Sequence, residues 1–245
     1  MPSLSLVIPS FNEARRLPTT LQNVSRYLRG SPFDESEVIV VDDGSSDGTS
    51  QAARSEQPTL AASGVALRVF RNDANRGKGY SVRRGMREAS HEWVLSCDAD
   101  ESAPIAEVEK LVDAARAGGH AVAIGSRALD RSLIGIHQPK YRECVGRLFN
   151  LNVRLVTGLR VADTQCGFKL FLRQAAQRIA AKQRIERFGF DVEQLYIAHK
   201  LGFSIAEVPV RWNNQPDSSV GLCDGLAAFA DVWRVRWNDL RGVYS

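Results

Sequence analysis

The sequence predicts an α/β fold in a single domain, with a mostly parallel central sheet and flanking helices. Three observations support this prediction. Short apolar runs alternate with amphipathic segments of helical spacing, which is the pattern of β-α-β units. The length of 245 residues and the apolar share of 44% suit one large domain. Several of the apolar runs end in polar clusters, and parallel sheets bind ligands at the carboxyl ends of their strands.

The expected strands are apolar runs bounded by turn residues: Leu4–Pro9, Glu37–Val41, Val65–Phe70, Glu92–Ser96, Ala121–Gly125, Phe168–Leu172 and Phe203–Val210. The expected helices show apolar residues at helical spacing: Asn12–Leu28, a short helix after Asp47, Lys78–Ala89, a helix opened by Pro104, Tyr141–Val156, a helix ending near Lys182, and Asp191–Leu201. Their alternation along the chain predicts which segments form the sheet and which cover it.

The end of the chain predicts an amphipathic helix. Its apolar face consists of Leu222, Leu226, Phe229, Trp233, Trp237 and Leu240. We expect this face to pack on the rest of the domain, as most such faces do. The alternative is a position in a membrane interface, because arginines lie close to the two tryptophans: Arg234, Arg236 and Arg241.

The composition and the start of the sequence indicate where the protein acts and which partners to expect. There is no run of about 18 apolar residues, and no basic segment precedes the first apolar run, so we expect a cytoplasmic protein or one bound peripherally at the cytoplasmic face of a membrane. The formal charge of +4 gives no reason to expect a nucleic-acid partner, and the oligomeric state is left open. Four cysteines without C-x-x-C spacing predict free buried thiols: Cys97, Cys144, Cys166 and Cys223.

Positive charge gathers in one segment. Between Ser126 and Arg160 there are seven lysines and arginines and two acidic residues, a net charge of +5 against +4 for the whole chain. This pattern indicates an anionic partner near the segment, although a solvated helix face would give the same pattern.

Two carboxylates follow the fourth expected strand. Asp98 and Asp100 are one residue apart, so both can reach one hard cation that is shared with substrate phosphates. A solvated turn would also accept such a triplet. The strand that leads directly into it, in a sheet with other acidic strand ends, favours a site for Mg²⁺ or Mn²⁺.

Two further clusters indicate a nucleotide. Asp42 and Asp43 end the second strand, where a carboxylate can accept hydrogen bonds from a base or ribose; a turn explains the following residues but not the doubled charge. Asn75–Gly79 opens a helix with glycines and Lys78, a combination that suits phosphate. The segment lacks the spacing of a Walker A loop.

Taken together these motifs resemble the nucleotide-sugar half of family 2 glycosyltransferases, which have the Rossmann-like GT-A fold. The motifs are Ile8–Glu13, Val41–Thr49, Asn75–Gly79 and Asp98–Asp100. Later motifs resemble the dolichyl-phosphate glucosyltransferase and mannosyltransferase branch, and the glucosyl members more closely: Gly125–Arg127, Asp163–Phe171 and Glu186–Glu193. The resemblance spans roughly residues 3 to 212.

The resemblance implies a role for each half of the domain. Residues 1–125 would bind the nucleotide-sugar, residues 126–221 the acceptor, and residues 222–245 would form the final helix. The nucleotide-sugar would contact Pro9, Phe11, Asn12, Glu13, Asp42, Asp43, Lys78 and Asp98, and Asp98 and Asp100 would hold the metal. The acceptor phosphate would meet Arg127, Arg142 and Lys169, and the sugar would lie among Asp163, Gln165, Asp191 and Glu193.

The expected reaction moves a hexose, with glucose from UDP-glucose favoured, to a dolichyl or undecaprenyl phosphate. A phosphate acceptor is largely dianionic at pH 7, so it needs positioning by arginines more than a general base. A single displacement would then invert the anomeric centre. The alternative is transfer from a UDP- or GDP-sugar, such as a mannose donor, to another lipid or to a saccharide hydroxyl. A hydroxyl acceptor would need a general base, for which Asp163, Asp191 and Glu193 are the candidates.

Other classes of protein fit less well. A nucleotidyltransferase would need a Gly-rich N-terminal loop with basic residues, which Pro9–Glu13 is not. A scaffold protein would bind the donor without metal and without turnover. One departure from the family concerns residues 217–221, where a lysine of the usual Gly-Ser-Lys-Leu segment is missing. Either Arg211 takes its place, or the loop is less engaged, or the acceptor differs.

Overall fold

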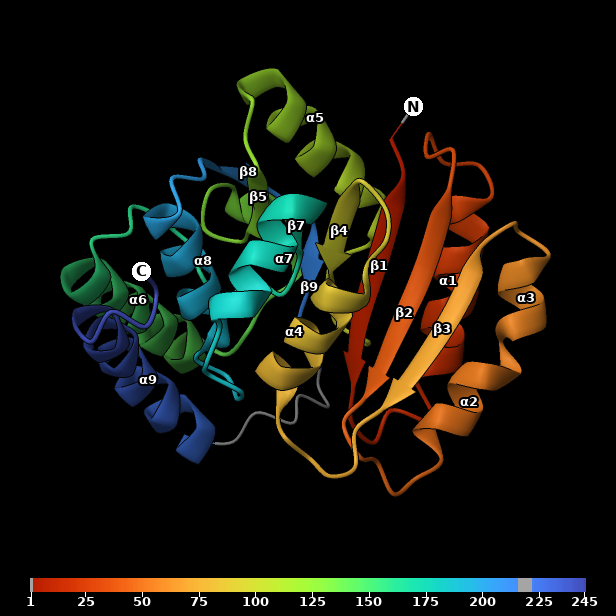
Figure 1. Ribbon diagram of the computed structural model, residues 1–245, viewed down its shortest axis with the longest axis horizontal. Coiled ribbons are helices and arrows are strands. Elements are labelled where there is room, and N and C mark those ends of the chain that lie inside the picture. Colours follow the sequence, from red (N-terminus) through yellow and green to blue (C-terminus); the bar gives the residue numbers. More distant parts are fainter. Residues whose placement is uncertain (1, 216–221) are drawn as a thin grey trace.

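The computed structural model describes residues 2–215 and 222–245 (Figure 1). Its centre is a seven-stranded sheet in the order β3-β2-β1-β4-β7-β5-β8. The strands are β1 (Leu4–Ser10), β2 (Ser36–Asp42), β3 (Ala66–Arg71), β4 (Trp93–Ser96), β5 (Val122–Ser126), β7 (Lys169–Leu172) and β8 (Ile205–Pro209). All neighbouring pairs are parallel except those of β7, which runs antiparallel to both β4 and β5. The prediction of a mostly parallel α/β sheet is confirmed.

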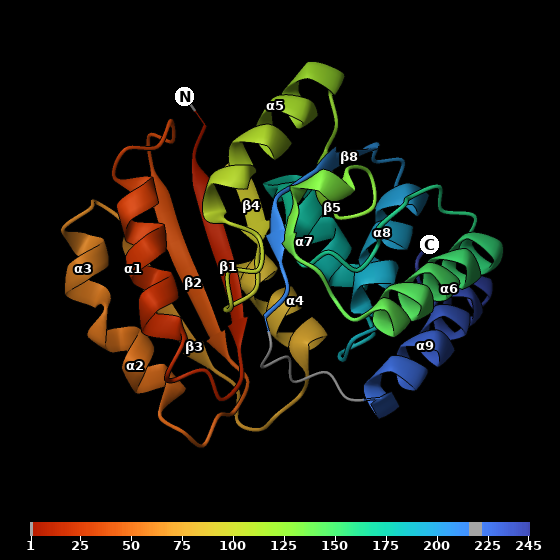
Figure 2. The ribbon, with the colours of Figure 1, turned by 180° about the vertical axis from the view of Figure 1, so that it is seen from behind.

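Helices cover both faces of this sheet (Figures 1 and 2). One face carries α1 (Leu17–Leu28), α2 (Thr49–Ser55), α3 (Gln57–Ala61) and α5 (Val108–Gly118). The other carries α4 (Lys78–Glu88), α7 (Arg173–Lys182) and α8 (Phe190–Lys200). Strand β1 shows why two cores form: Leu6 and Ile8 enter the first core and Val7 enters the second, because successive strand residues point to opposite faces.

Two smaller features were not predicted. A two-stranded sheet pairs β6 (Ile134–Ile136) with β9 (Trp212–Asn213). Short 3₁₀ turns precede α5, at η1 (Ile105–Glu107), and β6, at η2 (Arg131–Leu133). The two paired strands are too short to give a periodic signal, and their partners lie about 80 residues apart in the sequence.

The first helix begins later than predicted. Residues 12–16 form a loop before α1, in which the Asn12 amide donates to Ser45 Oγ at 2.9 Å and the Glu13 amide donates to Thr49 Oγ1 at 2.8 Å. Asn12 has a positive φ of 56°, which a helix does not allow. Contacts with the loop after β2 therefore override the helical periodicity of the segment.

Two long helices lie side by side at the far end of the sheet: α6 (Lys140–Thr157) and α9 (Leu222–Leu240). The Phe149 and Phe229 rings meet edge to face, with centroids 5.1 Å apart. No helix among residues 2–215 and 222–245 combines the length and the hydropathy that crossing a bilayer requires.

The expectation that the predicted apolar face of α9 packs internally is wrong for its C-terminal half. Trp233, Trp237 and Leu240 are 62%, 60% and 67% exposed. The helix instead buries Val232 and Val235, together with Ala228. Small side chains on this second face let α9 lie close against its neighbours, and the large ones turn outward.

The cysteines differ in their exposure. Cys97 and Cys166 are buried free thiols, as expected, whereas the free thiol of Cys144 is exposed on α6, which corrects the expectation of burial. The side chains of Cys223 and of Leu222 and Leu226 in the predicted apolar face, and residues 217–221 of the expected phosphate-binding segment, lie outside the described part of the chain.

Candidate functional site

An ion pair forms where β4 ends. Lys78, the first residue of α4, donates from Nζ to Asp98 Oδ1 at 2.5 Å. Burial alone would raise the pKa of Asp98, but the ammonium of Lys78 and the cations Lys169 and Arg127 hold it below its usual value. Asp98 is therefore ionised at neutral pH. Asp100 is half-buried and accepts the Ser102 amide at 2.9 Å.

A second ion pair, between Lys169 and Asp191, lies close enough to the first to act on its charges. Lys169, at the start of β7, is only 1% exposed, and its ammonium donates to Asp191 and to the carbonyl of Cys166. Asp191 is in the first turn of α8, and its negative charge helps to raise the pKa of Lys78. Four charged side chains, from α4, the loop after β4, β7 and α8, thus lie close to one another.

The acidic residues after β2 shape the neighbouring loops. Asp43 accepts the amides of Arg76 and Gly77 at 3.0 and 2.6 Å, so it fixes the turn that precedes Lys78. Asp42 is fully buried and accepts the Ser45 amide at 2.9 Å. Both carboxylates are bound within the protein.

Gly77 allows this turn to form. Its φ of +111° is a conformation that L side chains rarely adopt, and a Cβ there would lie 2.5 Å from the Glu186 carbonyl oxygen. The loop around Glu186 is thereby packed directly against the N-terminus of α4. Among the described residues, the two non-glycine positions with positive φ are Asn12 and Glu101. Asn12 lies in the loop after β1, and Glu101 lies in the loop after β4.

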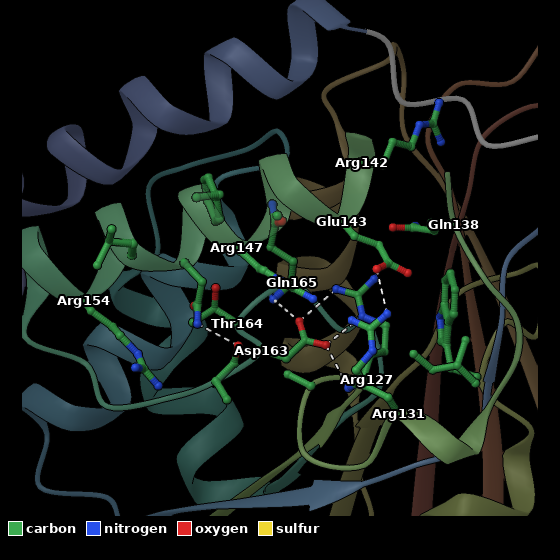
Figure 3. Close-up of a pocket in the computed structure, with 18 residues that line it drawn as sticks. Arg127, Arg131, Gln138, Arg142, Glu143, Arg147, Arg154, Asp163, Thr164 and Gln165 are labelled. Carbon is green, nitrogen blue, oxygen red and sulfur yellow. Dashed lines mark hydrogen bonds and ion pairs between the residues drawn. The ribbon is translucent and has the colours of Figure 1, made fainter. Parts of the chain in front are cut away.

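An arginine-lined pocket of about 370 Å³ opens beside the β5 end of the sheet (Figure 3). Five arginines line it: Arg127, Arg131, Arg142, Arg147 and Arg154. The acidic residues in its wall are Glu143 and Asp163. Figure 3 shows α6 along one side of the pocket, with Arg142 and Arg154 toward opposite ends of that helix. The pocket is suited to an anion with an extended body.

Arg127 is held in place from two sides. Its Nε and Nη2 donate to Asp163 Oδ2 and Oδ1 at 2.7 and 2.8 Å, and its guanidinium lies over the Trp212 ring at 5.3 Å. Glu207 on β8 accepts the amides of Ala162 and Asp163, both at 2.8 Å. Burial alone would raise the pKa of Asp163, but the Arg127 guanidinium holds it below its usual value.

Two buried polar atoms in the pocket wall have no hydrogen-bond partner within the described part of the protein. They are Thr164 Oγ1 and Asn150 Oδ1. Buried polar groups are normally paired, so an unpaired one at a cavity indicates a ligand or water. A ligand with hydroxyl groups or phosphate oxygens would satisfy Thr164.

Comparison of the sequence with known families identifies the family of this chain. The model of the family described as "Glycosyl transferase family 2" matches residues 5–180. The chain belongs to this family. A dolichyl-phosphate beta-glucosyltransferase from Homo sapiens is 38% identical over 98% of this chain and 77% of its own length. One from Saccharomyces cerevisiae is 33% identical over 98% and 76%. This protein is therefore a glycosyltransferase enzyme.

Solved structures agree on the GT-A fold. Mannosyl-3-phosphoglycerate synthase from Rubrobacter xylanophilus has a TM-score of 0.69 at 19% identity, covering 98% of this chain and 74% of that chain. Glucosyl-3-phosphoglycerate synthase from Mycobacterium tuberculosis, in complex with Mn²⁺, uridine-diphosphate and glucosyl-3-phosphoglycerate, has a TM-score of 0.64 at 21% identity, covering 97% and 79%.

The predicted site residues of this family 2 glycosyltransferase fall into groups. The structure brings Lys78, Asp98, Asp100 and Asp191 together at the sheet edge, and Arg127, Arg142, Asp163 and Gln165 at the pocket. Pro9 is buried in β1, whereas the Phe11 ring is exposed and Asn12 and Glu13 hold the loop that follows. Direct contacts of the β1 and β2 ends with a nucleoside stay predictions.

Two predicted side chains are held by contacts within the protein. Lys169 is buried against Asp191 and is not among the residues that line the pocket, so its contact with an acceptor phosphate stays a prediction. Glu193 is fully buried and accepts the amide of Ile185 and the hydroxyl of Tyr244, so it braces a loop. Arg211, the alternative to the missing lysine, is paired with Glu107 at 2.5 Å.

The donor set at the end of β4 fits a divalent cation. Asp98 and Asp100 supply hard carboxylate oxygens, the ligands that Mg²⁺ and Mn²⁺ prefer. A Cβ on residue 167 would lie 2.5 Å from Asp98 Oδ2, so Gly167 keeps space beside this carboxylate. No third His, Cys, Asp or Glu joins them within the described residues, so phosphate oxygens and water would complete the coordination.

Sequence reasoning missed several supporting residues. Trp212 contacts Arg127, and Glu207 holds the backbone of its partner Asp163. Both residues are far from Arg127 in the sequence, and no local sequence pattern predicts these contacts. Arg131, Arg147 and Arg154 contributed to the predicted charge excess without being singled out. For Arg147 and Arg154, a helical spacing of two turns is the signal that could have placed both on one side of α6.

Proposed function

We propose that this glycosyltransferase moves glucose from UDP-glucose to a polyprenyl phosphate of the dolichyl or undecaprenyl type, with inversion at the anomeric carbon. The observation that carries the proposal is the pocket lined by five arginines, one of which, Arg127, is close enough to Asp98 to help lower the pKa of that carboxyl group. The names of the relatives support a dolichyl-phosphate acceptor and a glucosyl group. The structures with bound uridine-diphosphate support a UDP-sugar, and those with Mn²⁺ or Mg²⁺ support a divalent metal.

The candidate bases favour a phosphate over a hydroxyl acceptor. A hydroxyl nucleophile needs a carboxylate that is free to take its proton. Asp163 is paired with Arg127, Asp191 with Lys169, and Glu193 is buried against backbone amides. An ionised phosphate oxygen has no proton to lose in this step, so a phosphate acceptor can react although these carboxylates are already paired or buried.

The chain's own residues then act by position. Arg127 and Arg142 would orient the acceptor phosphate so that one of its oxygens points at the anomeric carbon of the donor. Lys78 would lie beside the donor diphosphate and stabilise the charge that develops on it as the glycosidic bond breaks. A cation held by Asp98 and Asp100 would supply Lewis-acid stabilisation of the departing diphosphate.

Acceptor specificity tests the proposal. Purified protein is incubated with Mg²⁺ or Mn²⁺, a panel of UDP- and GDP-sugars and either a short polyprenyl phosphate or the matching polyprenol. We expect transfer from UDP-glucose to the phosphate alone, with a β-linked product from the α-linked donor. Equal transfer to the polyprenol, or a retained anomeric configuration, would overturn it.

Variants locate the acceptor site. Arg142→Ala is expected to lower kcat/KM for the polyprenyl phosphate by at least about tenfold, the effect of one lost charge-assisted contact, and to leave hydrolysis of UDP-glucose unchanged. Arg127→Ala is expected to cost about a hundredfold, because it removes one guanidinium from the pocket and also leaves the buried carboxylate of Asp163 without its bidentate partner. The control is Arg54→Ala, an exposed arginine on α2.

A further inference from the structure

The exposed apolar side chains of this protein are concentrated on two helices. In the described part of the chain, eleven large hydrophobic residues are exposed, and eight of them lie on α6 and α9. Those eight are Tyr141, Val145, Leu148, Leu151, Leu155, Trp233, Trp237 and Leu240. Scattered exposed apolar residues need no explanation, but a cluster on two neighbouring helices marks an interaction surface.

Helical spacing aligns these residues. On α6, Tyr141, Val145, Leu148 and Leu155 follow one another by four, three and seven positions, which places them on one face. On α9, Trp233, Trp237 and Leu240 are spaced by four and three. The two helices pack against each other (Figures 1 and 2). We call these seven residues the α6–α9 apolar face.

The charges around this face are mainly positive. Arg147 and Arg154 on α6, and Arg234, Arg236 and Arg241 on or after α9, are exposed. The carboxylate of Asp239 is shared by three partners: Tyr196 donates to it at 2.7 Å, and Lys200 and Arg236 each lie at 3.1 Å. Arg236 is therefore partly neutralised, and the net positive charge at the edge of the face comes from the other arginines. An apolar face bordered by arginines is complementary to a surface that is apolar inside and anionic at its edge.

We propose that the α6–α9 apolar face docks on an anionic lipid bilayer, with both helices lying in the interface. Tryptophan, tyrosine and leucine beside arginine are the residues that such interfacial helices use. The proposal rests on the proposed function in one respect: Arg147, Arg154 and Leu151 of α6 line the acceptor pocket, so docking would bring that pocket to the level of lipid phosphates.

Vesicle flotation tests docking without any substrate. The wild-type chain is expected to float with vesicles of phosphatidylcholine and phosphatidylglycerol, and to bind pure phosphatidylcholine or high-salt samples at least about tenfold more weakly. The double variants Trp233→Ser/Trp237→Ser and Leu148→Ser/Leu155→Ser are each expected to reduce binding at least about tenfold. All four positions are exposed, so folding should persist, which circular dichroism verifies.

A matched control uses exposed apolar residues elsewhere. Leu129→Ser/Ile136→Ser removes side chains that are 50% and 58% exposed but lie outside both helices, and it should float like the wild type. The proposal is overturned if the wild-type chain stays at the bottom of the gradient, or if the control loses as much binding as the tryptophan variant. It is also overturned if sedimentation shows a dimer that the tryptophan variant dissociates while vesicles bind neither protein.

A kinetic comparison separates this proposal from the proposed function. The tryptophan variant should transfer glucose to a water-soluble, short-chain polyprenyl phosphate at the wild-type rate, and should lose at least about tenfold in rate with a long-chain acceptor embedded in anionic vesicles. Failure of transfer to the soluble acceptor by the wild type would refute the function alone. Equal rates on vesicles would refute the docking alone.

Discussion

Asp163 and Arg127 show how one residue pair can serve both stability and binding. The carboxylate fixes the guanidinium through two hydrogen bonds, and Trp212 covers its face, so the arginine stands ready at the pocket before any ligand arrives. Pre-organisation of this kind reduces the entropy lost on binding, because the side chain is already ordered.

The pair makes folding stability depend on acid. The pKa of Asp163 is lowered in the folded protein, so its contribution to stability is present above the ordinary aspartate pKa and is lost as pH falls through the folded value. We expect Asp163→Asn to lose roughly 2 kcal/mol at neutral pH, and to lose less stability than the wild type as the pH falls below the ordinary aspartate pKa of about 4.

Urea denaturation across this pH range measures the effect. Asp113→Asn, which changes an exposed aspartate on α5, is the control and should follow the wild-type profile. Parallel profiles for the wild type and Asp163→Asn would contradict the prediction.

At the scale of elements, the loop before α8 links the last residues of the chain to the N-terminus of α4. Glu193 accepts the amides of Arg184 and Ile185 and the hydroxyl of Tyr244 at 2.5 Å. The same loop carries Glu186, whose carbonyl accepts the Tyr80 amide at 2.9 Å in α4. The last residues of the chain thereby support the turn that presents Lys78.

Removing one hydroxyl tests this support. Tyr244→Phe leaves a buried carboxylate without one of its donors, and we expect a loss of about 1–3 kcal/mol in unfolding free energy. Tyr141→Phe, which changes an exposed tyrosine, is the control. Thermal and urea unfolding measure both, and equal stability of the two variants would refute the bracing role of Tyr244.

Gly77 gives a second test at this scale. A methyl group there would meet the Glu186 carbonyl and force an unfavourable φ, so we expect Gly77→Ala to lose about 1–3 kcal/mol and to raise KM for the donor. The matched variant Gly30→Ala adds the same group where nothing lies within 4 Å. Unchanged donor kinetics in Gly77→Ala would contradict a role for this turn in placing Lys78.

For the whole molecule, metal removal should separate activity from folding. The two cores consist of apolar side chains and include neither Asp98 nor Asp100, and Lys78 pairs with Asp98, so a chelator is expected to abolish transfer while circular dichroism stays unchanged. Added Mg²⁺ or Mn²⁺ should restore the rate. Full transfer in excess chelator would refute metal dependence.

Much of the fold could be predicted from the sequence, because strand and helix periodicities are local. The strands β1, β2, β4 and β5 fall within about two residues of the expected ranges. The antiparallel course of β7 could not be predicted, since an apolar run does not reveal its direction. The exposure of Trp233 and Trp237 was equally hidden, because periodicity identifies an apolar face but not what lies opposite it.

The candidate site was predictable where motifs are contiguous and hidden where they depend on long-range contacts. Asp98, Asp100 and Lys78 follow strand ends or open a helix, so their proximity follows from a parallel sheet. The burial of Lys169 against Asp191 depends on how β7 and α8 pack, and 22 positions of sequence separate the two residues.

The reversed strand β7 has a consequence for how the chain assembles. It lies between β4 and β5 and pairs with both, although it follows both in the sequence. The two parts of the sheet are therefore joined only when this later segment is in place. Such distant pairings close large loops and slow the search for the native state. We therefore expect two fragments cut between α5 and β5 to remain inactive when separate, and to regain transfer only after refolding together.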